Sequence, residues 1–172
     1  MSYVLTQDKR QAYILRLPGK FEKELQLALV NNAINLGWAK ATGLTNNTLC
    51  YEDFREIIHN AYFPAEEDYR SSGRKAGNAW RFIHEMERGN YVLIPSKKGL
   101  YIGKVDSAPY FEDSFIEAER GYKRRICWLN NGKQIPLKNV PRKLQRKCKS
   151  SQSVTKADNL LQEIEFSLRA VQ

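Results

Sequence analysis

The chain has 172 residues, 42% hydrophobic and 27% charged, a composition that indicates a folded domain and excludes a disordered chain. No apolar run approaches the roughly 18 residues of a membrane span, and the first residues lack a signal-peptide pattern. We therefore expect a cytoplasmic protein with no membrane partner. The net charge of +9 favours a polyanionic partner, because neutralising phosphates releases condensed counterions.

Short strands and helices alternate in the first half of the chain. Apolar residues predict strands at 3–4, 12–17 and 35–39, and a helix or buried segment at 21–33. A helix is predicted at 51–61, where apolar residues recur at i, i+3, i+4 and i+7. The polar stretch 63–76 contains Pro64 and Ser71-Ser72-Gly73, and it predicts an exposed loop. Helical spacing resumes from Asn78 to Glu87.

The second half begins with the clearest strand pair. Residues 91–95 and 100–105 flank the turn Ser96–Gly99 and predict a β-hairpin. Further strands are predicted at 123–129 and 135–137, then a linker at 150–153 and an amphipathic helix at 157–171. Together these elements predict an α+β fold, a mainly antiparallel sheet with helices packed beside it.

One segment holds most of the excess charge. From Arg120 to Lys149, eleven of thirty residues are Lys or Arg and none is Asp or Glu. A solvated, salt-bridged face would mix the two signs, so the segment favours an anionic partner. A basic protein with no such partner is the alternative. The residues of this segment that we expect to contact a nucleic-acid backbone are Arg124, Arg125, Lys138, Arg142, Lys143, Arg146 and Lys147.

Signatures of catalysis are missing from the sequence. It contains neither a P-loop nor a G-x-S-x-G elbow, and the two histidines, His59 and His84, fall within predicted helices. Cys50, Cys127 and Cys148 have no zinc-type spacing. We therefore expect a module with no catalytic residues, no metal and no cofactor.

A resemblance to a known family spans about residues 36 to 145. The segment Gly77–Pro95 resembles the pattern G-x-x-W-R-F…G-D-x-V of the N-terminal recognition domain of Mrr-like, modification-dependent restriction endonucleases. Leu36-Gly37-Trp38, Tyr101–Val105, Arg124–Trp128 and Val140–Leu144 resemble the strands and the V-P-R-x-L segment of that family, in the same order. The layout is also similar to EVE and other PUA-like domains.

This resemblance implies a PUA-like (EVE-like) twisted β-barrel with flanking helices. Residues 1–149 would form the nucleic-acid recognition domain, and residues 150–172 a linker and a helix packed on it. The implied function is to read a modified base in DNA, flipped into a pocket, in a restriction or defence context. An RNA-binding PUA-like module, or an adaptor that binds an acidic protein, is the alternative.

The sequence also departs from the family. Gly89-Asn90 replaces its Gly-Asp, residues 106–121 form a longer insertion, and the nuclease domain does not follow. The chain is therefore interpreted either as a fragment of a larger protein or as a free-standing reader with a nuclease or motor partner.

The residues expected to form the base pocket come from several segments. Aromatic rings can stack on a base, and short polar side chains can bond to its edge. The expected pocket consists of Trp38, Asn78, Trp80, Ser96 and Tyr101, with Lys40 and Arg81 approaching the phosphates and Trp128 a further aromatic candidate. The competing interpretation is that the tryptophans are core residues, that Asn78 caps a helix and that Ser96 is a turn residue.

Overall fold

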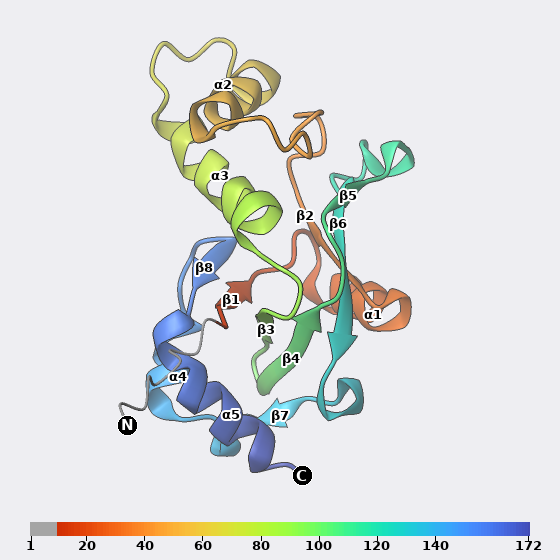
Figure 1. The fold of residues 1–172 in the computed structure, drawn as a ribbon, viewed down its shortest axis with the longest axis vertical. Helices are drawn as coiled ribbons and strands as arrows, with labels where there is room; N and C mark the ends of the chain where they lie inside the picture. Colours follow the sequence, from red (N-terminus) through yellow and green to blue (C-terminus); the bar gives the residue numbers. More distant parts are fainter. Residues whose placement is uncertain (1–9) are drawn as a thin grey trace, which may run out of the picture.

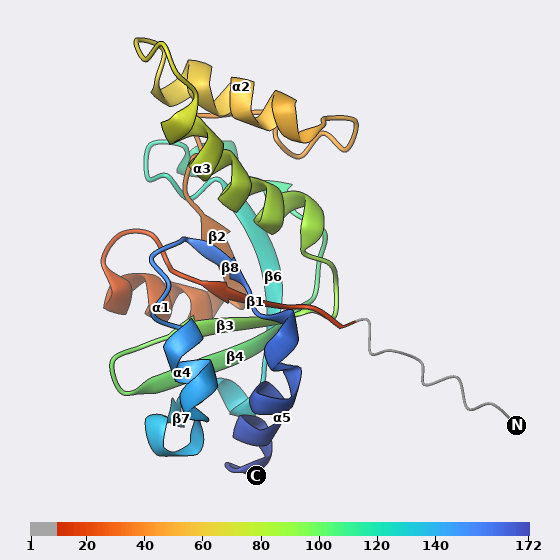
Figure 2. The same cartoon turned by 90° about the vertical axis from the view of Figure 1, so that its left-hand side faces the viewer.

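The computed structural model describes residues 10–172, which form an α+β domain on one curled sheet (Figures 1 and 2). Within these residues the main strands follow the order β2-β6-β4-β3-β1-β8. Their bounds are β1 Ala12–Leu15, β2 Ala33–Leu36, β3 Tyr91–Pro95, β4 Gly99–Val105, β6 Tyr122–Trp128 and β8 Val154–Lys156. Two short strands, β5 (Tyr110–Phe111) and β7 (Ile135–Pro136), pair with β6 and β4. Only the pair of β1 with β3 is parallel.

Strand β6 gives the sheet its curl. Its first residues, from Tyr122 to Arg125, pair with β2, and its last residues, from Ile126 to Trp128, pair with β4. The strand therefore passes from one part of the sheet to the other, and the sheet bends into half a barrel (Figure 1). Gly103 of β4 pairs with Trp128 of β6, and a Cβ atom at position 103 would lie only 2.7 Å from Ile126 Cγ1.

Both faces of the central strands are buried, which explains why β1 and β3 are apolar throughout. Alternate side chains point to opposite faces of the sheet and enter two separate cores. The first core receives Tyr13, Leu15, Val92 and Ile94, and the second receives Ala12, Ile14, Tyr91 and Leu93.

Helices cover the two faces. Their bounds are α1 Phe21–Asn31, α2 Tyr51–Tyr62, α3 Arg70–Trp80, α4 Arg142–Lys147 and α5 Leu161–Arg169. α1, α2 and α3 contribute to the first core, whereas α4 and α5 contribute to the second, on the other side of β1 and β3 (Figure 1). Shorter turns are η1 Arg81–Glu85, η2 Asp113–Phe115, η3 Asn130–Gly132, η4 Leu137–Asn139 and η5 Asp158–Leu160. No helix in residues 10–172 has the length and apolar character needed to cross a bilayer.

The prediction of a loop over residues 63–76 is wrong, because α3 begins at Arg70. This helix packs closely on α2 through small side chains, and Ser72 and Ala76 are completely buried. The Tyr51 hydroxyl donates to the carbonyl of Gly73 at 3.0 Å, which needs the same close approach. Small polar residues bury this face without the large apolar side chains that mark an amphipathic helix in a sequence.

Other boundaries shift for local reasons. α1 ends at Asn31 because Asn32 adopts the left-handed conformation (φ 48°), and β2 begins directly afterwards. β2 then ends before Trp38, which has φ 74°, so the strand predicted at 35–39 lies at 33–36. The strand predicted at 3–4 lies outside the described residues.

The C-terminal part contains a strand that the sequence did not indicate. β8 pairs antiparallel with β1, and η5 and α5 follow it in place of one helix from residue 157. Leu160 and Ile164 are buried in the second core, as the amphipathic pattern predicts. The α+β class, the predicted hairpin and the curled sheet with flanking helices are confirmed.

Candidate nucleic-acid interface

Residues at the end of β1, the start of α1, the β3–β4 turn and the end of α4 line a broad cleft. Its volume is about 950 Å³, and Leu17, Phe21 and Pro95 supply apolar surface. Four basic residues line it, against the single carboxylate of Glu22. They are Arg16, Lys20, Lys97 and Lys149.

These cations are exposed, and none of them forms an ion pair with a carboxylate of residues 10–172. Arg16 Nε donates to the carbonyl of Ser150, which holds the segment after α4 against β1. The other three side chains have no partner in the described part of the chain. The cleft therefore presents positive charge that the protein itself does not neutralise.

α4 adds further cations beside this cleft. Its side chain Leu144 is fully buried, and this contact fixes the helix so that its basic residues face solvent. Gln145 Nε2 donates to the carbonyls of Leu137 (3.0 Å) and Val140 (2.7 Å), which joins α4 to η4. Of the four cations of α4, only Lys143 forms an ion pair within residues 10–172, with Glu163 at 3.6 Å.

The turn of the hairpin continues the same surface. Leu137 N donates to the carbonyl of Lys98 at 3.1 Å, so η4 lies against the β3–β4 turn. Cations from distant parts of the sequence thus lie in the cleft or on the segments that border it, and we call this set of residues the basic face. It consists of Arg16, Lys20, Lys97, Lys98, Lys138, Arg142, Lys143, Arg146, Lys147 and Lys149.

The prediction that Arg124 contacts a nucleic-acid backbone is wrong. Only 2% of this residue is exposed, and its guanidinium donates to carbonyls at the end of the helix formed by α3 and η1. These acceptors are Phe82 (2.7 Å), Ile83 (2.9 Å) and Met86 (2.6 Å), with Ser107 (2.9 Å) as a fourth. Burial lowers the pKa of Arg124 to about 10, so it remains charged at neutral pH. Arg124 is a buried cap for a helix C-terminus.

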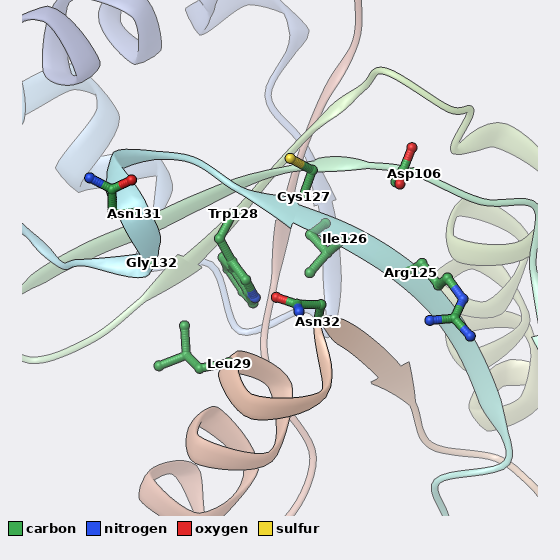
Figure 3. Close-up of a pocket in the computed structure, with 9 residues that line it drawn as sticks. All are labelled: Leu29, Asn32, Asp106, Arg125, Ile126, Cys127, Trp128, Asn131 and Gly132. Atoms are coloured by element: carbon green, nitrogen blue, oxygen red, sulfur yellow. The ribbon is translucent and has the colours of Figure 1, made fainter.

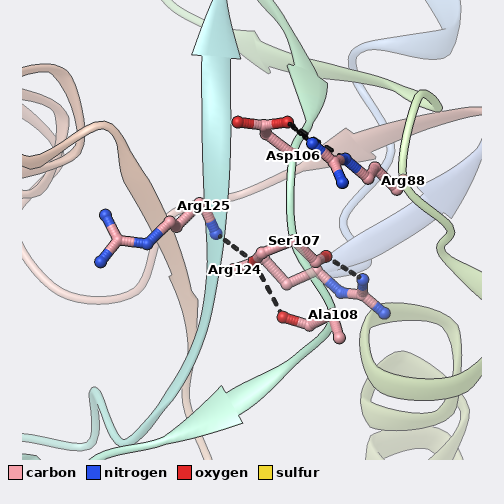
Figure 4. Close-up of polar contacts among 6 residues, drawn as sticks. All are labelled: Arg88, Asp106, Ser107, Ala108, Arg124 and Arg125. Atoms are coloured by element: carbon pink, nitrogen blue, oxygen red, sulfur yellow. Dashed lines mark hydrogen bonds and ion pairs between the residues drawn. The ribbon is translucent and has the colours of Figure 1, made fainter.

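Arg125 points to the opposite side of β6, as Figure 4 shows. Its backbone N–H donates to Ser107 Oγ at 2.8 Å, while its guanidinium is exposed and unpaired within residues 10–172. The alternation of a strand thus separates two adjacent arginines into a buried role and an exposed one.

Trp38 lies in an aromatic corner instead of an open slot. Its ring meets Tyr62 edge-on at 5.3 Å, and Lys75 Nζ sits 4.1 Å from its centroid. Glu119 accepts hydrogen bonds from the Tyr62 hydroxyl (2.6 Å) and from Ala39 N (2.9 Å). Lys40 N donates to the Tyr62 hydroxyl at 3.0 Å, so these bonds fix the backbone at Ala39 and Lys40. Trp38 is half-buried and lines none of the cavities that we describe in residues 10–172.

Asn78 and Trp80, both on α3, make contacts within the protein that conflict with their expected roles in the base pocket. Asn78 is buried, and its amide donates to the carbonyl of Arg74 (3.2 Å) and accepts from Val154 N (3.0 Å). Both functions of the amide are therefore used, which corrects its assignment to a base edge. Trp80 stacks on His84 with 4.4 Å between ring centroids, so the face toward His84 is occupied.

Ser96 and Tyr101, the other two residues expected in the base pocket, lie in different surroundings from Trp38. Ser96 lines the basic cleft, but its hydroxyl is bonded within the turn to Gly99 and to Gln134. Tyr101 belongs to β4 and packs against the first core. Arg81 is partly used as well, because it donates to the carbonyl of Val154 at 3.2 Å and so ties η1 to β8.

Trp128 supports α1, because its indole N–H donates to the carbonyl of Ala28 at 3.2 Å. It borders a groove of about 570 Å³ between α1 and β6, shown in Figure 3, together with Leu29 and Arg125. Half-buried and hydrogen-bonded, this ring forms a wall of the groove and not an exposed stacking surface.

The sequence pointed to the cations of α4 but not to those of the cleft. Arg16, Lys20 and Lys97 lie far from the acid-free segment along the chain, and only the pairing of β1, β3 and β4 brings them to it. The Lys97-Lys98 pair at the tip of a predicted hairpin was the available signal. No group of three potential metal ligands occurs in the described part of the chain.

The fold and its charges define the chain as a small half-barrel domain with one strongly cationic face. A family model described as a domain of unknown function, DUF8426, matches residues 19–156. The chain belongs to this family, and the match runs from just before α1 to the end of β8. Among curated proteins, none matches the sequence.

Proposed function

We propose that the protein is a nucleic-acid-binding module without catalytic machinery. The observation that carries this proposal is the basic face, where cations from the β1–α1 connection, the β3–β4 turn, η4, and α4 and its C-terminal end gather with few carboxylates near them. Unpaired cations that lie close together repel one another, and bound phosphates neutralise this repulsion. The counterions condensed on the nucleic acid are released at the same time, which favours binding.

The resemblance to Mrr-like recognition domains, and to EVE and PUA-like domains, supports a narrower proposal. In this form the protein reads a modified base in DNA, flipped out of the duplex, in a restriction or defence context. The curled half-barrel with helices on both faces is compatible with a PUA-like barrel. An RNA ligand, or an acidic protein bound by the same face, would give a different result in the test below.

The test compares oligonucleotide binding over a range of salt concentrations. Affinity should fall steeply between about 50 and 200 mM salt, equally for different sequences, because phosphate contacts carry no base information. Changing Arg146, Lys147 and Lys149 to glutamine should reduce the slope of log K against log salt by about 0.9 for each phosphate that the variant no longer neutralises.

A matched variant removes the same charge from another surface. Arg55, Arg70 and Arg74 are exposed on α2 and α3, and their change to glutamine should leave the slope unchanged. Equal losses in both triple variants would show that only net charge matters, and absence of binding at about 50 mM salt would refute the proposal. Parallel titrations with RNA, and with an acidic peptide, identify the alternatives.

Trp38 provides the test of base recognition. A base could stack on this ring only by displacing Lys75 Nζ from its face. Preference for a methylated base should be about tenfold at most, because one buried methyl is worth only about 1 kcal/mol. Trp38→Ala should remove the preference and leave the salt-sensitive binding. Unchanged selectivity in this variant would place the base elsewhere.

A further inference from the structure

A second pocket lies on the outer face of β2 and β6, away from the basic face. It is enclosed by α1 on one side and by residues of the insertion, including β5 and η2, on the other. Its volume is about 310 Å³, at the lower end of the range of roughly 300–1,000 Å³ typical of small-molecule sites. We call it the Asn35 pocket, after the residue at its base.

Strand register places three polar side chains in one row across this pocket. Asn35 of β2 is opposite Lys123 of β6, and Lys123 is opposite Tyr110 of β5. Their chain neighbours Ile34 and Tyr122 point into the first core, so this row faces outward. All three residues of the row line the pocket.

Asn35 has an unused hydrogen-bonding atom there. Only 8% of the residue is exposed, and its Oδ1 is buried with no hydrogen-bond partner in residues 10–172. A buried polar atom of this kind is rare, because the protein forfeits its hydration without a replacement. This oxygen is closed to solvent, so a ligand donor would supply the missing bond once the Asn35 amide turns toward the pocket, where it offers a donor beside the acceptor.

The walls of the pocket suit a flat ring. Leu27 and Ala28 of α1 supply apolar surface, while Tyr110 and Phe115 supply aromatic rings. Lys123 Nζ lies 3.5 Å from the centroid of Phe115 and 3.4 Å from Glu112 Oε2, so its charge is already held. Lys123 thus covers one face of Phe115, and the charge of Arg120, which also lines the pocket, is paired with Glu24. An acceptor–donor pair beside apolar and aromatic surface is the combination by which an asparagine recognises the amino-bearing edge of a base.

A free cation stands beside this row. Arg125 lies two residues beyond Lys123, about 7 Å along β6, and points to the same outer face. Its unpaired guanidinium lines both the Asn35 pocket and the adjoining groove (Figure 3). A guanidinium binds phosphate through paired hydrogen bonds, and this spacing leaves room for a sugar between base and phosphate.

We propose that the Asn35 pocket binds a nucleotide of adenine or cytosine, the bases whose amino group adjoins a ring-nitrogen acceptor on the Watson–Crick edge, with its phosphate on Arg125. The base donates its amino hydrogen to Asn35 Oδ1 and accepts from Asn35 Nδ2. The site uses none of the residues of the basic face, so with a free nucleotide it goes beyond the proposed function, whereas with a flipped nucleotide it rests on that function. Its occupant is either a free nucleotide or a nucleotide flipped from a bound strand.

Calorimetric titration of the whole chain with AMP, CMP, GMP, UMP and adenosine tests the site. AMP and CMP should bind more tightly than GMP and UMP, because guanine and uracil present a ring N–H donor where adenine and cytosine present an acceptor. Asn35→Leu, which keeps the volume but removes both hydrogen-bonding atoms, should weaken AMP binding by about tenfold to a hundredfold. Asn60→Leu, on the exposed surface of α2, is the control and should bind as the wild type does.

Arg125→Gln keeps the test decisive if Asn35→Leu fails to fold, because Arg125 is exposed. This variant should bind AMP more weakly but adenosine as before, a difference that a general structural effect would not produce. Failure of every nucleotide to bind at millimolar concentration, or equal AMP affinity in wild type and Asn35→Leu, would overturn the proposal.

Competition then identifies the source of the nucleotide. If AMP displaces an oligonucleotide, the base of a bound strand occupies the pocket, and if both bind together, the ligand is a free nucleotide. The triple variant of Arg146, Lys147 and Lys149 should lose oligonucleotide affinity and keep AMP affinity. Loss of the basic-face function and loss of the pocket are therefore distinguishable.

Discussion

Changing Arg124 to methionine is expected to destabilise the protein by about 3–4 kcal/mol, although the position lies in a segment rich in exposed cations. The guanidinium bridges β6 to the end of the α3–η1 helix through the carbonyls of Phe82, Ile83 and Met86. Methionine fills the space of the stem but donates no hydrogen bond. The helix end would then be buried without a cap.

The magnitude follows from two opposing contributions. Each buried carbonyl left without a donor costs about 1–3 kcal/mol, so three helix-end carbonyls cost about 3–9 kcal/mol. From the middle of that range, about 6 kcal/mol, removal of the buried charge returns about 2–3 kcal/mol of desolvation free energy, which leaves a net loss of about 3–4 kcal/mol. For a chain of 172 residues this corresponds to a fall in melting temperature of roughly 6–16 °C.

Thermal and urea unfolding of matched variants measures this effect. Arg125→Met removes the same group from the next residue, which is exposed, and should change the stability by less than about 0.5 kcal/mol. Arg124→Lys should fall between wild type and Arg124→Met, because an ammonium cannot reproduce the planar fork of donors. A loss below about 1 kcal/mol in Arg124→Met would show that the capping bonds do not stabilise the fold.

Two further predictions concern single residues of the first core and the sheet. Burial, and then the charge of Arg124, lower the pKa of His84 from its ordinary value of 6.5, so the folded state binds fewer protons there than the unfolded state. The free energy of unfolding should therefore decline as the pH falls below about 6.5. His84→Phe keeps the stacking on Trp80 but cannot bind a proton, so its melting temperature should decline less than that of the wild type between about pH 7.5 and 5.5. An equal decline in both proteins would exclude His84 as its source. Gly103→Ala should cost about 1–3 kcal/mol in urea unfolding, because the new methyl group would lie 2.7 Å from Ile126 Cγ1; an unchanged midpoint would mean that Ile126 moves freely.

Much of the fold could be predicted because local patterns and tertiary packing agree. The hairpin of β3 and β4 has a polar turn between two apolar strands, and α2 has one continuous apolar face, so both were recognised. α3 and β8 were missed because their signals are not local. α3 buries small side chains against α2, and the three residues of β8 are defined by their pairing with β1.

The candidate sites also divide into features that local sequence patterns predict and features that depend on tertiary contacts. Exposed cations of α4 were predictable from a basic run without carboxylates, since α4 buries only Leu144. The cleft beside them depends on strand pairing across the chain, and the Asn35 pocket depends on which face of β2 is outward. Nothing in the sequence around Asn35 distinguishes an asparagine with an unused acceptor from one in a turn.

Strand β6 shows why the charge of a segment is not the charge of a surface. Arg124 stabilises a helix end within the first core, whereas Lys123 and Arg125, on either side of it, face outward and line the Asn35 pocket. A variant that neutralised all three residues could weaken ligand binding even if none of them touched the ligand, because the loss of Arg124 alone would destabilise the helix end that it caps. Arg125 can be changed without touching the core, so nucleotide affinity in Arg125→Gln reports on the outer face alone.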